Sequence, residues 1–231
     1  MLRVRDVTIA YGAEPILENV DLEVKAGEFT SLIGPSGSGK TSILRAVTAL
    51  LRPRSGTIAL DVSPNEVGFL FQDDALLPWR TVRQNVALGL RIRGVAMKEA
   101  EAKADQWLSL VGLAGFGARY PRQHSAGQRK RVAIAQVLAL QPRLLLMDEP
   151  FASLDAIVRT RITQELLGWV ERERLTVLLV THDLEEAISA SDVVYVLSQG
   201  PRATIRARHE VPIERPRNVL ETRRHPLFGS L

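Results

Sequence analysis

The chain has 231 residues, of which 45% are hydrophobic, and its formal net charge is +4. This length and composition allow a full hydrophobic core, which excludes a disordered protein and suits one α/β domain with an inserted subdomain. The absence of cysteine excludes disulfides, zinc ribbons and thiol catalysis. No apolar run approaches the roughly 18 residues that a membrane-spanning helix needs. We expect a soluble intracellular protein without a signal peptide.

Much of the positive charge lies near the end of the chain. After residue 200, arginines outnumber glutamates: Arg202, Arg206, Arg208, Arg215, Arg217, Arg223 and Arg224 against Glu210, Glu214 and Glu221. Such a segment can face nucleic acid or anionic lipid, but it is more often a solvated surface. We therefore expect residues 201–231 to be a basic C-terminal segment that is mostly solvated.

Strand patterns dominate the first 72 residues. Residues 3–10 and 20–25 alternate apolar and polar side chains and predict a small antiparallel sheet, with Asn19 and Ala26-Gly27 as turns. The next predicted elements are strand 29–33, helix 41–51, strand 57–60 and strand 67–71. We expect residues 1–72 to supply a β subdomain and the first part of an α/β core.

The pattern changes after residue 72. Helical spacing covers residues 81–90 and 98–111, and Gly112 has the position of a helix C-cap, so residues 73–135 are expected to be an inserted helical subdomain. Strands and helices then alternate: helix 128–140, strand 143–148, helix 155–173, strand 175–181, helix 184–189 and strand 193–197. This alternation predicts a mostly parallel sheet, completed by residues 136–200, with its ligand at the carboxyl ends of the strands.

The loop after strand 29–33 fits the phosphate-binding pattern G-x-x-x-x-G-K-[ST]. Its residues are Gly34, Pro35, Ser36, Gly37, Ser38, Gly39, Lys40 and Thr41. Small residues let backbone N–H groups surround a polyphosphate, and the following helix adds the positive end of its dipole. Lys40 is expected to reach the β and γ oxygens, and Thr41 to ligate Mg²⁺. The alternative, a plain glycine-rich turn, is disfavoured by the strand–loop–helix context.

The apolar strand 143–148 ends in two carboxylates, Asp148 and Glu149. Enzymes that cleave nucleotides hold their metal with this arrangement. Asp148 is therefore expected to orient Mg²⁺, directly or through water, and Glu149, which should point elsewhere, to accept a proton from the attacking water. The alternative is an acidic pair that caps a helix before Pro150.

Residues 124–128 read His-Ser-Ala-Gly-Gln and resemble the signature motif of ATP-binding cassette (ABC) ATPases, usually L-S-G-G-Q. Other landmarks of that family follow in order: Tyr11 resembles the adenine-stacking aromatic, Gln72 the Q-loop, Ser153-Leu154-Asp155 the D-loop and His182 the switch histidine. The resemblance covers nearly the whole chain. It implies one ABC ATPase domain over residues 1–231, with an α/β P-loop NTPase (RecA-like) core, a small antiparallel β subdomain and an inserted α-helical subdomain.

The resemblance also implies the residues of the site. The implied catalytic residues are Glu149, His182, Lys40 and Gln72. The implied ATP-binding residues are Tyr11, the loop from Gly34 to Thr41, Ser42, Ser125, Gly127, Gln128 and Asp155. The implied Mg²⁺ ligands are Thr41, Gln72 and Asp148. A structural role is the alternative for isolated members such as Tyr11 and His182.

The signature motif departs from the family pattern twice. His124 stands where leucine is usual, and Ala126 stands where the first glycine is usual. Ser125, Gly127 and a helix that begins at Gln128 preserve most of the anion site. If Ala126 takes a positive φ, its methyl group costs about 1 kcal/mol and hinders closure. A cassette with weakened hydrolysis, paired with a more active one, therefore stays an alternative.

In this family the signature of one subunit meets the phosphate loop of another. The resemblance implies an ATP-dependent pair, expected to be a homodimer, with two ATP molecules buried across a two-fold axis. Transport then requires a separate membrane permease, whose cytoplasmic helix docks beside Gln72 to about Asn85. A solute-binding protein takes part indirectly. The implied location is the cytoplasmic face of the cell membrane.

Three segments, 71–79, 197–201 and 211–217, are similar to the nitrate, sulfonate and taurine importer branch, and hydroxymethylpyrimidine importers look alike. We therefore predict the ATP-hydrolysing subunit of an importer for a small anionic or organic solute. The competing hypothesis is an ABC ATPase that acts on ribosomes or DNA, which the arginine-rich segment would favour. The single cassette, without coiled-coil or zinc-bearing insertions, disfavours it, so nucleic acid is not an expected partner.

Overall fold

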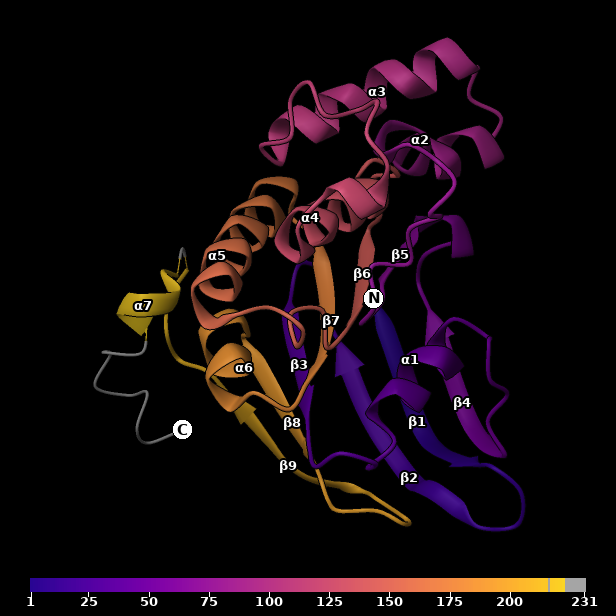
Figure 1. Cartoon of the computed structure of the whole chain (residues 1–231). Coiled ribbons are helices and arrows are strands. Elements are labelled where there is room, and N and C mark those ends of the chain that lie inside the picture. The colour runs from indigo at the N-terminus through magenta and orange to yellow at the C-terminus, as the bar shows by residue number, and fades with distance from the viewer. Residues whose placement is uncertain (216, 223–231) are drawn as a thin grey trace.

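The computed structural model describes residues 1–215 and 217–222, and a six-stranded sheet forms its centre (Figure 1). The strand order is β5-β6-β7-β3-β8-β9, and every neighbouring pair is parallel except β8 and β9. These strands are β3 (Phe29–Ile33), β5 (Val67–Leu70), β6 (Leu144–Asp148), β7 (Thr176–Thr181), β8 (Val193–Leu197) and β9 (Ile205–Glu210). The mostly parallel sheet agrees with the prediction from strand–helix alternation.

A three-stranded antiparallel sheet, β2-β1-β4, packs on one side of this core. Its strands are β1 (Leu2–Ala10), β2 (Pro15–Val24) and β4 (Ser55–Leu60). The predicted turn at Asn19 is wrong, because β2 continues through this residue. Asn19 has a φ of 48° and lies where the pairing of β1 with β2 shifts register, and Thr8 donates its hydroxyl to Asn19 Oδ1 at 3.3 Å. The local turn signal therefore marks a bulge.

Helices cover both faces of the large sheet (Figure 1). They are α1 (Lys40–Val47), α2 (Val82–Ile92), α3 (Met97–Leu110), α4 (Ala126–Leu138), α5 (Ala156–Glu173), α6 (Leu184–Ala190) and α7 (Val219–Thr222), with short 3-10 turns at Pro64–Glu66 and Pro121–Gln123. The expected helix 41–51 ends early, because Ala49 takes a left-handed φ of 57°. Gly112, with a φ of 75°, follows α3 as expected of a C-cap glycine.

Strand β6 illustrates how the layers share one sheet. Leu145 and Met147 belong to the core beneath α4 and α5, whereas Leu144 and Leu146 belong to the core shared with α1 and the small sheet. Successive side chains of a strand point to opposite faces, so a fully apolar strand fits a sheet that is covered on both sides. Helices α2 and α3 pack against α4 at the top of Figure 1.

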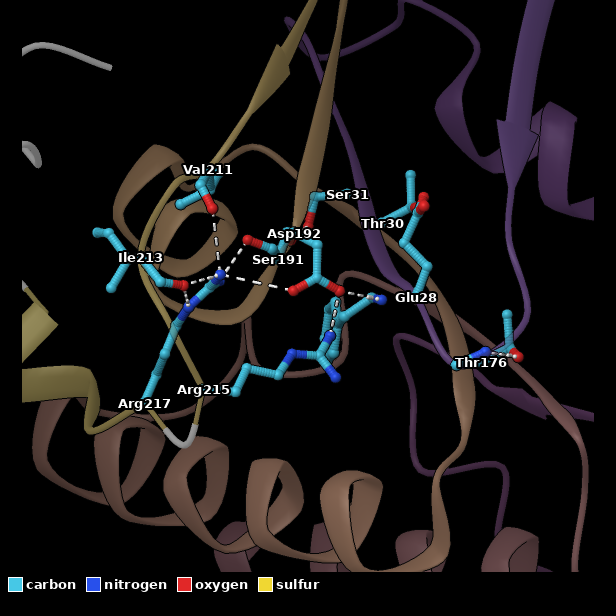
Figure 2. Close-up of polar contacts among 12 residues, drawn as sticks. Glu28, Thr30, Ser31, Thr176, Ser191, Asp192, Val211, Ile213, Arg215 and Arg217 are labelled. Atoms are coloured by element: carbon cyan, nitrogen blue, oxygen red, sulfur yellow. Dashed lines mark hydrogen bonds and ion pairs between the residues drawn. The ribbon is translucent and has the colours of Figure 1, made fainter.

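The C-terminal segment is less solvated than the sequence predicts. Figure 2 shows Arg217 inside a polar cluster, and its side chain is only 5% exposed. Its guanidinium donates to the carbonyl oxygens of Ser191, Val211 and Ile213, and lies 3.5 Å from Asp192 Oδ1. The prediction of a solvated arginine is therefore wrong here.

Asp192 joins this cluster to the start of the central strand. Its Oδ2 accepts a hydrogen bond from Phe29 N at 2.9 Å. The same carboxylate pairs with Arg215 (Figure 2). Strand β9 was not predicted from the sequence, although Ile205 and Ala207 alternate with Arg206 and Arg208 and are the more buried side chains of the strand. Arg223 and Arg224 lie outside the described residues.

None of the helices in the described part of the chain has the length and apolar composition required to cross a bilayer.

We predict that Arg217→Met lowers the free energy of unfolding by about 1–3 kcal/mol, because the substitution leaves the carbonyl oxygens of Ser191, Val211 and Ile213 without their buried donor, whereas Asp192 keeps Arg215. Urea unfolding followed by circular dichroism measures the change. Arg206→Met is the matched control, since Arg206 is exposed on β9. Equal stability of the two variants would contradict a structural role for the cluster.

Candidate functional site

The loop between β3 and α1 presents the open end of a helix. Gly39 precedes α1 with a φ of 90°, and a Cβ atom built on it would lie 2.7 Å from Leu17 Cγ, so only glycine fits. Among the described residues, no side chain hydrogen-bonds to the start of α1 at this cap. The first N–H groups of the helix can therefore bind an anion, together with the positive end of the helix dipole.

Lys40 turns back into this loop. Its Nζ donates to the carbonyl oxygens of Gly34 at 2.8 Å and Pro35 at 2.9 Å, and lies 3.9 Å from Glu149 Oε1. Burial lowers the pKa of Lys40, and the carboxylates of Glu149 and Asp148 oppose this shift. The loop thus holds a nearly buried ammonium group where the phosphates of a nucleotide would lie.

The two carboxylates at the end of β6 diverge, as predicted. Thr41 donates its hydroxyl to Asp148 Oδ1 at 2.9 Å, so Asp148 faces the start of α1. Burial raises the pKa of Asp148, a cost that a bound cation would offset. Glu149 adopts a left-handed φ of 40° and turns toward His182, whose Nδ1 lies 3.0 Å from Glu149 Oε2. The strained turn aims two adjacent carboxylates at different partners.

A cavity of about 490 Å³ gathers half of the predicted ATP residues. Its walls are Tyr11, Ile16, Ser36, Gly37, Gly39, Lys40, Thr41, Ser42, Gln72 and Glu149. The ring of Tyr11 is 53% exposed and its hydroxyl lies 3.3 Å from Ser42 Oγ, which leaves an aromatic face available. Ser38 lies differently, since its side chain is fully buried.

The donor set beside this cavity suits Mg²⁺. Thr41, Asp148 and Gln72 offer hydroxyl, carboxylate and amide oxygens, which are the hard ligands that this ion prefers. The Thr41 hydroxyl and the Asp148 carboxylate already touch, and Gln72 lines the same cavity. The residues present therefore fit the ion.

Four of the other predicted ATP residues lie elsewhere. Ser125, Gly127, Gln128 and Asp155 line a second hollow of about 360 Å³, which shares no lining residue with the first. Ser125 caps α4: its hydroxyl accepts from Gln128 N at 3.3 Å, and Gln128 Oε1 accepts from Ser125 N at 3.1 Å. Asp155 caps α5 by accepting from Val158 N at 3.0 Å. Within one chain, these two sets of residues are not brought together.

The structure corrects two expectations about the signature motif. Helix α4 begins at Ala126, not at Gln128, because Ser125 is the capping residue. Ala126 is therefore helical and is not among the positive-φ residues of the described chain, so its methyl group causes no backbone strain. The glycine that sterics require is Gly127, where a Cβ atom would lie 2.8 Å from Val158 Cγ1.

His124 fills an apolar position. Its side chain is only 5% exposed, its ring centroid lies 5.8 Å from that of Phe116, and neither ring nitrogen has a hydrogen-bond partner among the described residues. Burial lowers the pKa of His124. A neutral imidazole thus replaces the usual leucine as a packing group.

Glu186 supports the segment that contains His182, and its role was not predicted from the sequence. Thr181 donates its hydroxyl to Glu186 Oε2 at 2.5 Å, and the same hydroxyl oxygen accepts from Asp183 N at 3.0 Å. Asp183 in turn caps α6 by accepting from Glu186 N at 3.1 Å. The capping pattern Asp-x-x-Glu was visible in the sequence, but burial of the glutamate was not.

We predict an unusual pH dependence of stability from Glu186. Burial raises the pKa of Glu186 to about 7, from an ordinary value of 4.5. The folded state therefore binds this proton more tightly than the unfolded state, and the stabilisation is present below pH 4.5 and lost as the pH rises to about 7. Relative to Glu186→Gln, the wild type should lose about 3 kcal/mol over this interval.

Urea unfolding at several pH values between 4.5 and 8 measures this difference. The exposed Glu185→Gln variant is the control and should parallel the wild type. A stability difference between wild type and Glu186→Gln that does not change with pH would contradict the prediction.

Known proteins resemble both the sequence and the fold. The family model described as ABC transporter matches residues 17–152. The nitrate import ATP-binding protein NrtD of Synechocystis sp. is 40% identical over 227 residues, which cover 94% of this chain and 85% of that protein. The sulfate/thiosulfate import ATP-binding protein CysA of Mycobacterium tuberculosis is 45% identical over 209 residues, covering 85% of this chain.

This chain spans only part of several relatives. It covers 58% of CysA and 33% of the bicarbonate transport ATP-binding protein CmpC of Synechocystis sp., to which it is 40% identical over 223 residues. The dimeric post-hydrolysis structure of the ATP-binding cassette MJ0796, bound to ADP and Pi, superimposes with a TM-score of 0.80 at 31% identity and covers 93% of this chain. The predicted family and the P-loop NTPase fold are thereby confirmed: the chain belongs to the ABC transporter family and is an ATP-binding cassette.

Proposed function

We propose that this chain is the ATP-hydrolysing subunit of a membrane importer. The observation that carries the proposal is the placement of Lys40, Glu149 and His182 around one cavity edge, with Lys40 at 3.9 Å and His182 at 3.0 Å from the two oxygens of Glu149. This arrangement combines a cation for phosphate, a carboxylate that can take a proton and an imidazole that can hold it in place. The names of the importer relatives support the same function.

In the proposed reaction, Tyr11 stacks on the adenine and the N–H groups at the start of α1 bind the phosphates. Lys40 exchanges its contacts with loop carbonyl oxygens for the β and γ oxygens. Thr41, Asp148 and Gln72 would hold Mg²⁺, which would supply positive charge to the phosphates. Glu149 takes a proton from the attacking water while His182 orients the glutamate and contacts the γ-phosphate.

The separation of the two hollows supports a paired assembly. Ser125 and Gly127 offer a hydroxyl and a helix start, but they do not line the cavity that holds Lys40. A second copy placed head-to-tail would bring its signature residues to the phosphates of this chain, and each copy would complete the other's site. ATP would then hold the pair together, and hydrolysis would release it. We propose a homodimer of this kind.

The helical region offers a docking surface for a permease. A groove of about 350 Å³ is lined by Arg80, Gln84, Ala87, Leu88, Arg91, Ile92, Met97 and Glu101. Trp79 lies next to it in the sequence and is 71% exposed. Large exposed aromatic side chains are favoured anchors in protein interfaces. We propose that a cytoplasmic helix of the permease docks here, which would hold the chain at the inner face of the membrane.

The substrate class follows from the relatives and not from the cavity. Nitrate, bicarbonate and sulfate or thiosulfate appear in their names. We propose a small anion as the solute, captured by a solute-binding protein and passed to the permease. The rival function on ribosomes or DNA loses support, because Arg217 is buried and Arg215 is paired with Asp192.

We predict that Glu149→Gln keeps ATP binding but lowers turnover about 100-fold or more, because the amide cannot accept the proton from water. The variant should accumulate as a closed dimer with ATP, which size-exclusion chromatography detects. Glu173→Gln, an exposed change at the end of α5, should behave as wild type. Near-normal turnover of Glu149→Gln would remove Glu149 from the role of base.

We predict that affinity purification from gently solubilised native membranes recovers a multi-spanning permease and a solute-binding protein with the tagged chain. Trp79→Ala should reduce recovery of the permease at least about tenfold, since interface anchors cost more than 1.4 kcal/mol when truncated. Leu50→Ala is the control, because Leu50 is 69% exposed and does not line the groove. Recovery of ribosomes or DNA without a membrane protein would support the rival function.

A further inference from the structure

Lys130, on α4, is a charged residue with no contact to solvent. Its side chain is 0% exposed. The Nζ atom lies 3.3 Å from Phe71 O, 2.9 Å from Gln72 O and 3.3 Å from Asp74 Oδ1. An ammonium group has three N–H donors, so these three oxygens satisfy it completely. Burying such a charge is costly unless it is fully paired, and the partners all belong to one short segment, 71–74.

The neighbouring residue strengthens the same connection. Arg129 places its Nε 3.0 Å from Asp74 Oδ2, and its Nη1 donates to His124 O at 2.9 Å. Two consecutive residues of α4 therefore hold the two oxygens of one carboxylate. Segment 71–74 lies between β5 and α2, outside both elements, so its position depends on these contacts with α4.

The two ends of this connection belong to different hollows. Gln72 lines the nucleotide cavity with Lys40 and Thr41, whereas Ser125 and Gly127 line the second hollow at the start of α4. Lys130 lies five positions after Ser125, which is a rise of about 7.5 Å along a rigid element. A shift at the start of α4 therefore moves the ammonium group, and with it the backbone oxygen of Gln72.

We propose that Lys130 is a positioning residue that makes the placement of Gln72 in one nucleotide site depend on the nucleotide held against Ser125 and Gly127 of the same chain. The inference rests on the paired assembly of the proposed function, in which that second nucleotide belongs to the partner subunit. ATP bound in the partner's site pulls the start of α4 toward it, and Lys130 transmits this displacement of the helix to Gln72. By linkage, the coupling acts equally in the opposite direction.

Cooperativity distinguishes this role from a purely structural one. A lysine that only stabilises the fold would affect thermal stability and leave the dependence of turnover on ATP concentration unchanged in shape. A lysine that couples two sites affects that shape, because the Hill coefficient for two coupled sites lies between one and two.

The experiment compares Lys130→Met with wild type as full-length chain assembled with its permease. Steady-state turnover is measured against ATP concentration, and binding of a fluorescent ATP analogue is measured on the dilute, unpaired chain. We expect a Hill coefficient above one for wild type and near one for Lys130→Met. The variant should also have a maximal rate at least tenfold lower than wild type. Its affinity for the ATP analogue should stay within twofold of the wild-type value. Lys103→Met is the control, since Lys103 is exposed on α3 and pairs with Glu99 at 2.8 Å.

A second variant covers the case in which Lys130→Met does not fold. Asp74→Asn keeps both carbonyl partners of Lys130 and removes the carboxylate, whose side chain is 21% exposed. Asp74→Asn should also have a lower Hill coefficient than wild type. Full cooperativity in either folded variant would overturn the inference. Wild-type turnover with a Hill coefficient of one would also overturn it while leaving the proposed function intact, whereas the absence of any turnover would contradict the proposed function itself.

Discussion

The parallel pairing of β6, β7 and β3 is the constraint on which the site depends. Its register places Asp148 opposite Val180 and Ile33 opposite Thr181, so the three strands end at the same edge. Residues far apart in the chain, in the phosphate loop, at the end of β6 and after β7, therefore meet. Both faces of these strands are buried, so a slip by one residue would move each side chain into the opposite core and disrupt its packing, which keeps the edge aligned.

The buried lysines Lys40 and Lys130 have different kinds of partners, and the difference fits their proposed roles at the nucleotide site. Lys40 has loop carbonyl oxygens for partners, and Glu149 lies between Lys40 and His182. These contacts can be exchanged for those of a nucleotide at little cost, because a phosphate oxygen replaces a carbonyl oxygen as acceptor. Lys130 differs, since its partners are all supplied by the protein and leave no position for a ligand. The first arrangement suits binding, and the second suits transmission of movement.

The division into two hollows is what would make the proposed reaction depend on a partner. Capping residues at the starts of α4 and α5 form one surface, and the start of α1 forms the other. Both surfaces lie at helix starts, where the helix dipole favours anions, but side chains cap α4 and α5, whereas the start of α1 has no side-chain cap among the described residues. Neither contains all the groups that the proposed hydrolysis needs, so assembly and chemistry are expected to depend on each other.

The sequence by itself determined the features that arise from local spacing. The phosphate loop, the strand that ends in Asp148 and Glu149, and the alternation of strands with helices were all correctly predicted, because each depends on neighbours within a few residues. The family followed from the order of these motifs. Helix and strand ends were correct to within a few residues at most positions, and β2, whose bulge at Asn19 resembles a turn, was the main exception.

Only the tertiary structure decided the properties that depend on distant partners. Strand β9 forms because β8 offers it an edge, and Arg217 is buried because Asp192 and Ser191 approach it from 25 or more residues away. Ala126 is free of strain because Ser125 begins the helix. Lys130 looks like one more basic residue in its local sequence, and its role arises from carbonyl oxygens that lie 58 and 59 positions earlier in the chain. Such contacts follow from the packing of α4 on segment 71–74, which no local pattern encodes.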